Sequence, residues 1–501
     1  MNYLLSAVPI LLVLALMLFF HRGSHQAGFA GWLAGIAVAF LFFGLNGSVL
    51  WVSQVKALLL TINVLAVLWP ALLLYHIVDN AGGVRAIANA LQQMIPEPGW
   101  LLVVLAWMLS PLMENLAGFG LPIAIVAPML ILLGVIPVRA VAAVAVGHSW
   151  AVSLGGMALA LRTMTDITGL SESEVFPFAA ILLGVCVLLT GLASAWLLNQ
   201  LHFWKRIVLL SLIVALTQFL VGYFVTIPLS SFSAAIVGVL AGMLLGKRPP
   251  GKKIRAEMTP QLKGGLVAYG FLFVSIIVIS VIQPLNRWLA GVRLNSNFPE
   301  VVTNHGLVTA AGPGFIYKPF THPGVWILLS ALVALLLLPR ITHSGKTDLG
   351  AALAATGRSG LPATLGTIFM IGLSTLMEHT GMTLTIARGL SQAFGNVYPL
   401  VAPLVGALGA FATGSNTNSN ILFGPMQKGV AILLNISPVL LLAAQTTGGS
   451  LGSMIAPAKL AVGGSTNAMK GREGEILRMT LPIGLICTLL IGGLALILIS
   501  L

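Results

Sequence analysis

The stretch ATGSNTNSNILFG (412–424) decides the fold of this chain. Seven consecutive polar or glycine residues, Gly414 to Asn420, interrupt the apolar runs VYPLVAPLVGALGAFA (397–412) and ILFGPMQKGVAILLN (421–435). A polar break at membrane depth is tolerated only where it is buried in protein or lines a water-filled cavity. The stretch therefore predicts a re-entrant hairpin over 398–434, with a tip that lines a cavity.

The composition places the whole chain in a membrane. Of its 501 residues, 58% are hydrophobic and only 7% are charged, against about a quarter charged in soluble proteins. The net charge of +13 does not indicate nucleic acid, because the basic residues fall in short loops between apolar runs. Cys186 and Cys487 lie mid-span and predict neither a disulfide framework nor a metal site. The N-terminus has no basic n-region and is interpreted as a first span.

Runs of about 20 apolar residues predict transmembrane helices. We expect spans at 3–21, 28–46, 57–78, 138–165, 175–200, 206–225, 228–246, 265–285, 323–340, 360–379, 438–463 and 476–500. A second broken stretch, 99–136, predicts another re-entrant hairpin. The fold class is therefore an all-α polytopic membrane protein with about 12 transmembrane helices and two re-entrant hairpins.

Basic loops set the expected orientation, because lysine and arginine gather on the cytoplasmic side. Most of the chain's 25 basic residues fall on one face of this topology, in loops that include 204–206, 247–255, 339–350 and 470–478. This predicts cytoplasmic loops there and both termini outside. The longest external loop, 286–322, is interpreted as a passive connector or as a lid.

The two halves of the chain resemble each other. VDNAGGVRAIANALQQM (78–94) aligns with MEHTGMTLTIARGLSQAF (377–394), pairing Asp79 with Glu378. Further on, Pro137 pairs with Pro438, and Gly147 with Gly448. The two units cross the membrane in opposite directions in this topology, and inverted repeats with interrupted helices are typical of secondary transporters.

The predicted domains follow from this repeat. The N-terminal repeat covers 1–250, with the hairpin 99–136 and a broken helix at 138–165. A basic cytoplasmic linker covers 251–264. The C-terminal repeat covers 265–501, with the hairpin 398–434 and a broken helix at 438–463.

The first hairpin breaks at SPLMENLAGFGLP (110–122), where Glu114 is the sole acid between apolar flanks. An ionisable group at that depth costs roughly 2.5–3.5 kcal/mol on insertion scales, which favours a functional role. The alternative is a protonated glutamate that caps the following helix. The spans after the hairpins break as well, at VGHSWAVSLGG (146–156) and QTTGGSLGS (445–453).

Half-helices that start at these four breaks would direct their N-termini at one centre, and such termini attract anions. The predicted substrate-binding residues are Glu114, Asn115, Gly118, Phe119, Gly120, His148, Ser149, Ser415, Asn416, Thr417, Asn418, Ser419, Asn420, Gln445, Thr446 and Thr447. Candidates for proton coupling are Glu114, His148, Asp79 and Glu378. The alternatives are a neutral His148 bonded to the backbone and simple helix-end charges at Asp79 and Glu378. Arg162 and Lys459 lie beyond the breaks and could attract an anionic substrate, but the favoured interpretation for both is that they snorkel to the membrane surface.

The chain resembles the lactate permease family at ENLAGFGLPIAIVAPMLILLG (114–134), TGSNTNSNILFGPMQ (413–427) and AAQTTGGSLGSMIAPAKLAV (443–462). The resemblance implies import of L-lactate, D-lactate and glycolate with protons. It also implies membership of the wider ion transporter superfamily, whose members move hairpin-tip sites by an elevator-like shift. Asn115 and Asn416 stand where the family usually has Gly and Asp, so the exact substrate and the coupling ion stay open.

Other functions are weighed against this one. A sodium-coupled carrier of a keto acid or a sulfonate is the alternative within the class, and an anion channel is a further one. HExxH, GxSxG and Walker A patterns are absent from the sequence, so neither an enzyme nor an ATP-driven pump is expected. We expect no cofactor besides the coupling ion and no metal site. The expected partners are a small monocarboxylate and the lipid bilayer of a bacterial inner membrane, with a homodimer left open.

Overall fold

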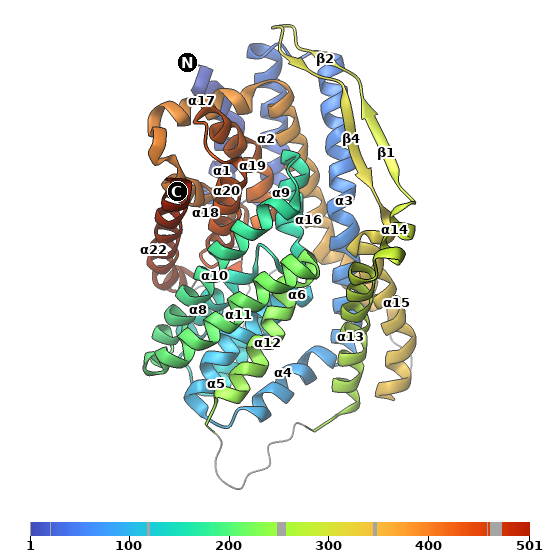
Figure 1. Ribbon diagram of the computed structural model, residues 1–501, viewed down its shortest axis with the longest axis vertical. Helices are drawn as coiled ribbons and strands as arrows, with labels where there is room; N and C mark the ends of the chain where they lie inside the picture. The colour runs from blue at the N-terminus through green and yellow to red at the C-terminus, as the bar shows by residue number, and fades with distance from the viewer. Residues whose placement is uncertain are drawn as a thin grey trace.

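The computed structural model describes residues 2–20, 22–117, 121–247, 257–343, 348–457, 459–460 and 473–500. In this part of the chain, 11 helices are long and apolar enough to cross a membrane, or 12 if a bent pair, Pro137–Ala151 and Gly155–Thr168, counts as one span. The helices run roughly along the long axis of the molecule (Figure 1). The predicted class, a polytopic helical membrane protein, is confirmed.

The N-terminal half contains two outer helices, a long helix, an amphipathic helix, a hairpin, a broken helix and three further helices. These are α1 (Asn2–Leu18), α2 (Ser24–Phe42), α3 (Gly47–Asn80), α4 (Gly83–Met94), α5 (Pro98–Val104), the π-helical turn η1 (Leu105–Leu109), α6 (Ser110–Ala117), α7 (Leu121–Leu132), α8 (Pro137–His148), η2 (Ser149–Ala151), α9 (Gly155–Thr168), α10 (Glu172–Leu197), α11 (Trp204–Phe224) and α12 (Ser230–Leu245). The first hairpin therefore consists of α5, η1 and α6 as one arm and α7 as the other.

The described part of the C-terminal half also contains a long helix, an amphipathic helix and a hairpin in that order, but a single helix follows α20 where three follow α9. The described helices of this half are α13 (Pro260–Val281), α14 (Gln283–Ala290), α15 (Pro323–Thr342), α16 (Leu349–His379), α17 (Met382–Phe394), α18 (Tyr398–Thr413), α19 (Asn416–Leu433), α20 (Pro438–Gly452) and α22 (Glu473–Ser500). Helices α18 and α19 form the second hairpin. Its arms match the predicted range, 398–434, to within a residue.

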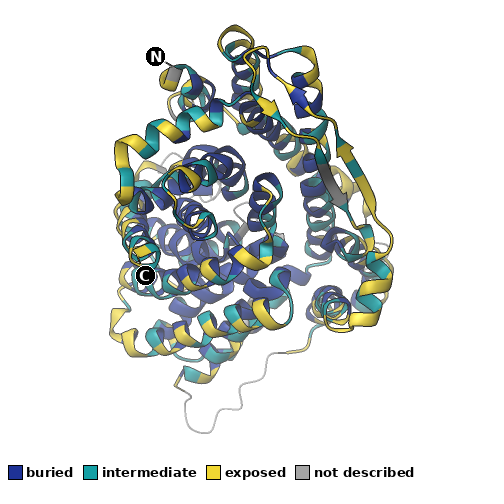
Figure 2. Cartoon of the chain, turned by 45° about the horizontal axis from the view of Figure 1, so that its top comes forward, coloured by how far each residue is buried: buried dark blue, intermediate teal, exposed yellow. Residues whose placement is uncertain are grey.

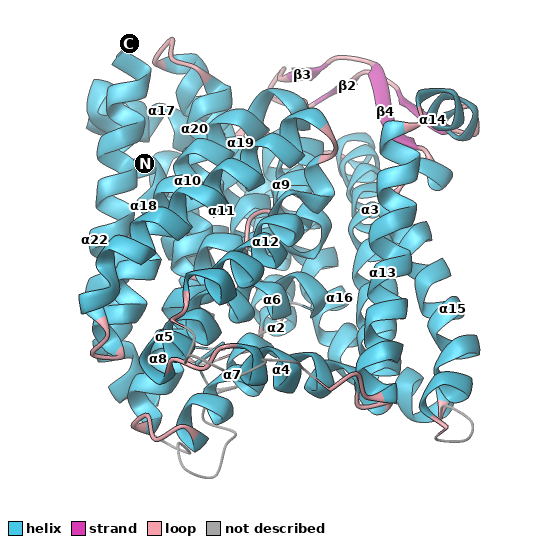
Figure 3. Cartoon of the chain, turned by 60° about the horizontal axis from the view of Figure 1, so that its bottom comes forward, coloured by secondary structure: helices cyan, strands magenta, loops and turns pink. Residues whose placement is uncertain are grey.

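The predicted connector at 286–322 contains strands, which the sequence analysis did not anticipate. Strand β1 (Leu294–Phe298) pairs antiparallel with β4 (Gly312–Tyr317), and β2 (Val301–Val302) pairs with β3 (Val308–Thr309). The side chain of Asn46, the residue before α3, donates to the carbonyl of Val302 at 2.8 Å. The strands are thereby attached to one end of the helical body (Figure 3).

The two halves share a local feature where the long helices end. Gly82 and Gly381, the residues before α4 and α17, are both left-handed, with φ of 75° and 79°. Glycine adopts this conformation without a steric penalty. Helices α4 and α17 lie at opposite ends of the molecule (Figure 1). These features agree with a repeat of opposite direction, which stays a prediction.

The core lies where the broken helices pack against the first arms of the hairpins. Helices α8 and α20 are buried along almost their whole length, and the outer helices carry the exposed residues (Figure 2). Two equivalent glycines allow this packing. A Cβ added at Gly147 would overlap the carbonyl oxygen of Ala106, and one added at Gly448 would overlap that of Pro403. The backbones are therefore in direct contact at both places.

Replacing Gly448 by alanine is expected to destabilise the folded protein by about 1–3 kcal/mol, because the added methyl group overpacks a rigid backbone contact. Thermal unfolding of the purified protein in detergent would show a lower midpoint. Gly270→Ala is the matched control, since nothing lies within 4 Å of a Cβ added at Gly270 in α13. Equal midpoints for both variants would contradict the close packing.

Candidate functional site

A cavity of about 110 Å³ lies where the two hairpins, the start of α9 and the middle of α3 meet. Val67, Leu68 and Ala71 of α3 form an apolar wall, and the hairpin residues supply the polar lining. A water molecule occupies roughly 10–15 Å³ on this measure. The cavity therefore has room for several waters or for one small organic anion.

The tip of the second hairpin presents a helix N-terminus to this cavity. Helix α18 ends at Thr413, Gly414 is left-handed with φ of 70°, and α19 begins at Asn416. The Ser415 hydroxyl caps α19 by accepting from the N–H of Asn418 at 3.3 Å. Ser415, Asn416 and Thr417 all line the cavity. The positive end of the α19 dipole therefore faces it, as the polar stretch predicts.

The start of α9 forms the facing side of the cavity. Gly156, Met157 and Ala158 are left-handed, with φ of 54°, 63° and 58°. Gly155 and Gly156 line the cavity. A left-handed conformation costs a residue with a side chain roughly 1–2 kcal/mol, so Met157 and Ala158 are strained. Strain of this kind gathers at binding sites, where the surrounding structure fixes the backbone.

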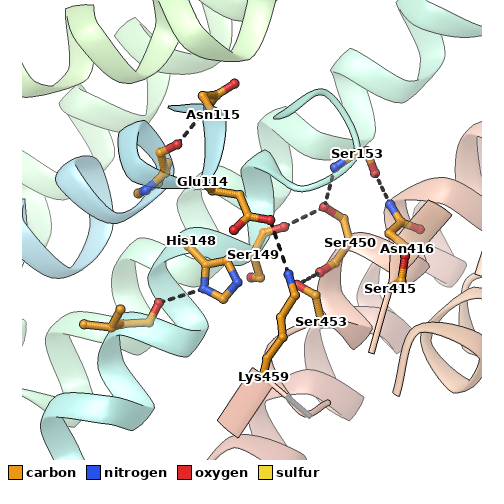
Figure 4. Close-up of polar contacts among 12 residues, drawn as sticks. Glu114, Asn115, His148, Ser149, Ser153, Ser415, Asn416, Ser450, Ser453 and Lys459 are labelled. Carbon is orange, nitrogen blue, oxygen red and sulfur yellow. Dashed lines mark hydrogen bonds and ion pairs between the residues drawn. The ribbon is translucent and has the colours of Figure 1, made fainter. Parts of the chain in front are cut away.

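Glu114 and Lys459 form a buried ion pair in the wall of the cavity. The Glu114 Oε1 and Lys459 Nζ atoms are 3.3 Å apart, and the two side chains are only 7% and 8% exposed (Figure 4). Glu114 Oε2 has no hydrogen-bond partner among the described residues. The prediction that Lys459 snorkels to the membrane surface is wrong. Its ammonium group instead lies between the two hairpins, and these two are the only ionisable side chains among the described lining residues.

His148 lies beside this ion pair, at the end of α8 (Figure 4). Its Nδ1 lies 3.0 Å from the carbonyl oxygen of Val144. A carbonyl only accepts, so Nδ1 carries the hydrogen, and in the neutral ring Nε2 is an acceptor. Nε2 is buried without a hydrogen-bond partner among the described residues. His148 does not itself line the cavity.

Asn416 joins the second hairpin tip to both broken helices. Its side-chain amide donates to the Ser153 hydroxyl at 2.9 Å and to the Thr446 carbonyl at 3.1 Å. The Ser153 N–H donates to the Ser450 hydroxyl at 3.1 Å, and the Ser450 hydroxyl donates to the Ser149 carbonyl. This network crosses from one half of the chain to the other and holds the cavity in shape (Figure 4).

Several predicted binding residues lie behind the tip and bond to other parts of the protein. The Ser419 hydroxyl donates to the Gly406 carbonyl and accepts from Gln445. Asn420 donates to Ala160 and to Thr446. The Ser149 and Thr447 hydroxyls donate to carbonyls within their own helices. Six predicted residues do not line the cavity: Ser149, Ser419, Asn420, Gln445, Thr446 and Thr447. Their contact with substrate stays a prediction.

Some of the remaining predicted residues line the cavity, and others do not or lie outside the described residues. Asn115 lines the cavity and donates to Pro111 and Ser231. Asp79 and Glu378 are at the ends of α3 and α16 and do not line the cavity. The predicted residues Gly118, Phe119 and Gly120 lie outside the described residues.

A second cavity of about 260 Å³ shares Lys459, Ser415 and Thr417 with the first. It extends from the hairpin tip toward the start of α2 and the middle of α16, where Ser24, Ser359 and Thr367 line it. The Asn418 side chain faces this second cavity as well. The tip therefore separates two adjoining spaces, and Lys459 borders both.

Arg162 is engaged away from the cavity. Its guanidinium forms an ion pair with Glu172 at 2.6 Å. One turn further along α9, Asp166 accepts from the side-chain amide of Asn63 in α3 at 2.5 Å. The sequence analysis did not identify Asp166, Asn63 or the apolar wall of α3, because no local pattern marks them.

A helical membrane chain in which the first arm of one hairpin and the tip of another meet around a small cavity with a buried ion pair has features typical of a membrane transporter. The family comparison makes the class more specific: this chain belongs to the L-lactate permease family, whose model matches residues 2–501.

Individual relatives agree with this assignment. The L-lactate permease of Escherichia coli (strain K12) is 26% identical over 98% of this chain and 95% of its own length. The glycolate permease GlcA of the same organism is 25% identical over 85% of this chain and 84% of its own. Among solved structures, Neisseria gonorrhoeae MtrF is 17% identical with a TM-score of 0.46, covering 94% of this chain and 84% of its own. That score is too low to add to the assignment.

Proposed function

We propose that this chain imports small 2-hydroxy-monocarboxylates, namely L-lactate, D-lactate and glycolate, by proton symport across a bacterial inner membrane. Relatives across the length of the chain are named as L-lactate and glycolate permeases. The observation that carries the proposal is Lys459, the one cation among the described residues that line a cavity of about 110 Å³, which α19 faces with its N-terminus. One cation and one helix dipole suit one carboxylate.

The proton would be carried by Glu114. A substrate carboxylate beside Lys459 also lies beside Glu114, and two like charges at this distance disfavour each other. Substrate binding therefore favours proton binding to Glu114, and proton binding favours substrate to the same degree. This reciprocal effect is the thermodynamic basis of symport.

Alternating access is part of the proposal. We propose that the two halves are inverted repeats and that the hairpins and broken helices move past α3 and α16 in an elevator-like shift. The cavity lies at this boundary, with Val67 and Leu68 of α3 on one side and the tip on the other. Both termini would lie outside in this orientation.

Reconstitution tests the proposal. Purified protein in liposomes should accumulate labelled lactate when a proton gradient is imposed, with or without sodium. A sodium gradient alone should give no accumulation. Accumulation driven only by sodium would instead favour the sodium-coupled alternative, in which the oxygens of Glu114 and Asn115 would hold the ion. Dissipation of a gradient through an open pore, without accumulation, would indicate a channel.

Dicarboxylates are expected to compete poorly with lactate. A second carboxylate in the cavity would find no second cation among the described lining residues, and an unpaired buried charge costs several kcal/mol. Glycolate should therefore inhibit lactate uptake at concentrations at least 100-fold below those that succinate needs. Propionate, which has one carboxylate and no 2-hydroxyl, is the control for the hydroxyl. Equal inhibition by succinate and glycolate would contradict a site with one cation.

A further inference from the structure

We propose that Lys459 exchanges its counter-ion during transport. In the empty transporter its partner is the Glu114 carboxylate, and in the loaded transporter its partner is the substrate carboxylate, while Glu114 carries a proton. The consequence is that one proton moves with each substrate and no net charge crosses the membrane. This inference rests on the proposed function and specifies its stoichiometry and the residue that binds the carboxylate.

The geometry of the ion pair favours exchange. Among the described residues, the pairs Arg162–Glu172 and Arg206–Glu97 have contacts of 2.6 and 2.7 Å, and their side chains are 15–24% exposed. The Lys459–Glu114 pair is more deeply buried and yet longer, at 3.3 Å. Ammonium–carboxylate contacts usually measure roughly 2.7–2.9 Å. The pair is therefore loose, and both members line the cavity of about 110 Å³.

The net charge of the site determines in which forms it can reorient from one side of the membrane to the other. With Lys459 charged, the empty site is neutral only when Glu114 is ionised. With an anionic substrate bound, it is neutral only when Glu114 is protonated. The other two forms, an empty protonated site and a loaded ionised site, each hold one unpaired charge. Moving such a charge through the protein interior is costly because it loses its hydration. Only the two neutral forms should reorient, which gives obligatory symport of one proton with one substrate.

His148 supplies a hydrogen-bond acceptor for the protonated form of Glu114. A protonated Glu114 becomes a donor and needs an acceptor. Glu114 Oε2 and His148 Nε2 are both buried without partners among the described residues, and the two side chains lie together (Figure 4). The proton would form an O–H bond at Oε2 and be shared with Nε2. It leaves to water on the release side when the substrate departs and Lys459 returns to Glu114.

The charged and titratable groups around Glu114 come from three elements. Lys459 and His148 face it directly (Figure 4). On α9, Arg162 is occupied by Glu172 of α10, and Asp166 is bonded to Asn63 of α3. Neither Arg162 nor Asp166 lines the cavity. Among the described residues, Lys459 and His148 are therefore the charged or titratable groups that face Glu114.

Wild-type protein in liposomes tests the stoichiometry, with the pH gradient and the membrane potential set independently by buffers and by potassium with valinomycin. Lactate should accumulate about tenfold for each pH unit at any potential, because equal numbers of protons and substrates move. If one net charge moved, each 100 mV would change the accumulation about 50-fold. A dependence on potential of that size would overturn the inference while leaving proton symport intact. Failure of a pH gradient to drive uptake would instead overturn the proposed function.

Substitutions of His148 test its positioning role. His148→Leu removes the acceptor of the protonated Glu114, on which the loaded form depends, and should lower both proton-driven accumulation and lactate exchange at least tenfold. His148→Gln keeps an acceptor oxygen and should restore most of the accumulation. Equal loss of both activities in both variants would indicate a purely structural histidine and contradict this part of the inference.

Discussion

Replacing Glu114 by glutamine is expected to abolish proton-driven accumulation of lactate while leaving lactate exchange within a few-fold of wild type. Glutamine resembles the protonated acid, so the loaded site, with Lys459 and the substrate as partners, stays neutral. The empty site then holds Lys459 without a counter-ion and cannot reorient. Exchange needs only the loaded form to move, whereas net transport needs both forms. Counterflow and gradient-driven uptake in the same liposomes measure the two activities separately.

Glu97→Gln is the matched control for this variant. Glu97 is also ion-paired, with Arg206 at 2.7 Å, but it immediately precedes α5, at the start of the first hairpin, and does not line the cavity. Its variant should keep both activities. If the Glu114→Gln protein still concentrates lactate against a gradient, Glu114 is not the coupling acid. His148, Asp79 and Glu378 would then be the next candidates.

Replacing Lys459 by glutamine is expected to weaken lactate binding at least 100-fold. Removing one partner of a buried ion pair costs roughly 3–5 kcal/mol when the other charge stays unpaired. Here the unpaired charge is the substrate carboxylate, because Glu114 can neutralise itself by protonation. Binding of lactate to the purified protein, measured by calorimetry, gives the affinity directly. Exchange should fall in parallel, in contrast to the Glu114→Gln protein.

Two controls separate binding from folding in this experiment. Lys428 is a partly buried lysine on α19 whose ammonium donates to the Thr168 carbonyl at 2.6 Å, outside the cavity. Lys428→Gln should keep the affinity within a few-fold. The double variant Glu114→Gln/Lys459→Gln contains no buried unpaired charge and should unfold at a temperature close to wild type, yet still bind lactate weakly. Near-normal affinity in either Lys459 variant would contradict its role.

The hairpins could be predicted from sequence because a polar break within apolar residues is a local signal. The described arms of the first hairpin, 98–117 and 121–132, and those of the second, 398–413 and 416–433, fall within a few residues of the expected ranges. The starts of the long helices were less well predicted. Helix α3 begins at Gly47. The predicted span began at 57 because the polar residues Gln54 and Lys56 in the first turns interrupt the apolar run. Helix α16 likewise begins at Leu349 rather than at 360.

The site could be predicted only in part, because some of its residues have no local signal in the sequence. Glu114 and the tip residues stand out as polar groups inside apolar sequence. Lys459, in contrast, lies near the end of an apolar stretch, where a lysine usually snorkels to the interface. The fold brings it to Glu114 across 345 positions. The same holds for Val67 and Leu68 of α3, which are ordinary apolar residues in sequence and form the cavity wall only through packing.

The most direct test of the central claim is the number of protons taken up when lactate binds. Calorimetric titration of the purified protein near neutral pH, in two buffers that differ in ionisation enthalpy, gives this number without any membrane. Counter-ion exchange predicts that wild-type protein takes up close to one proton per lactate bound and that the Glu114→Gln protein takes up none. Lactate binding to the wild-type protein with no proton uptake, or equal uptake by both proteins, would contradict the account.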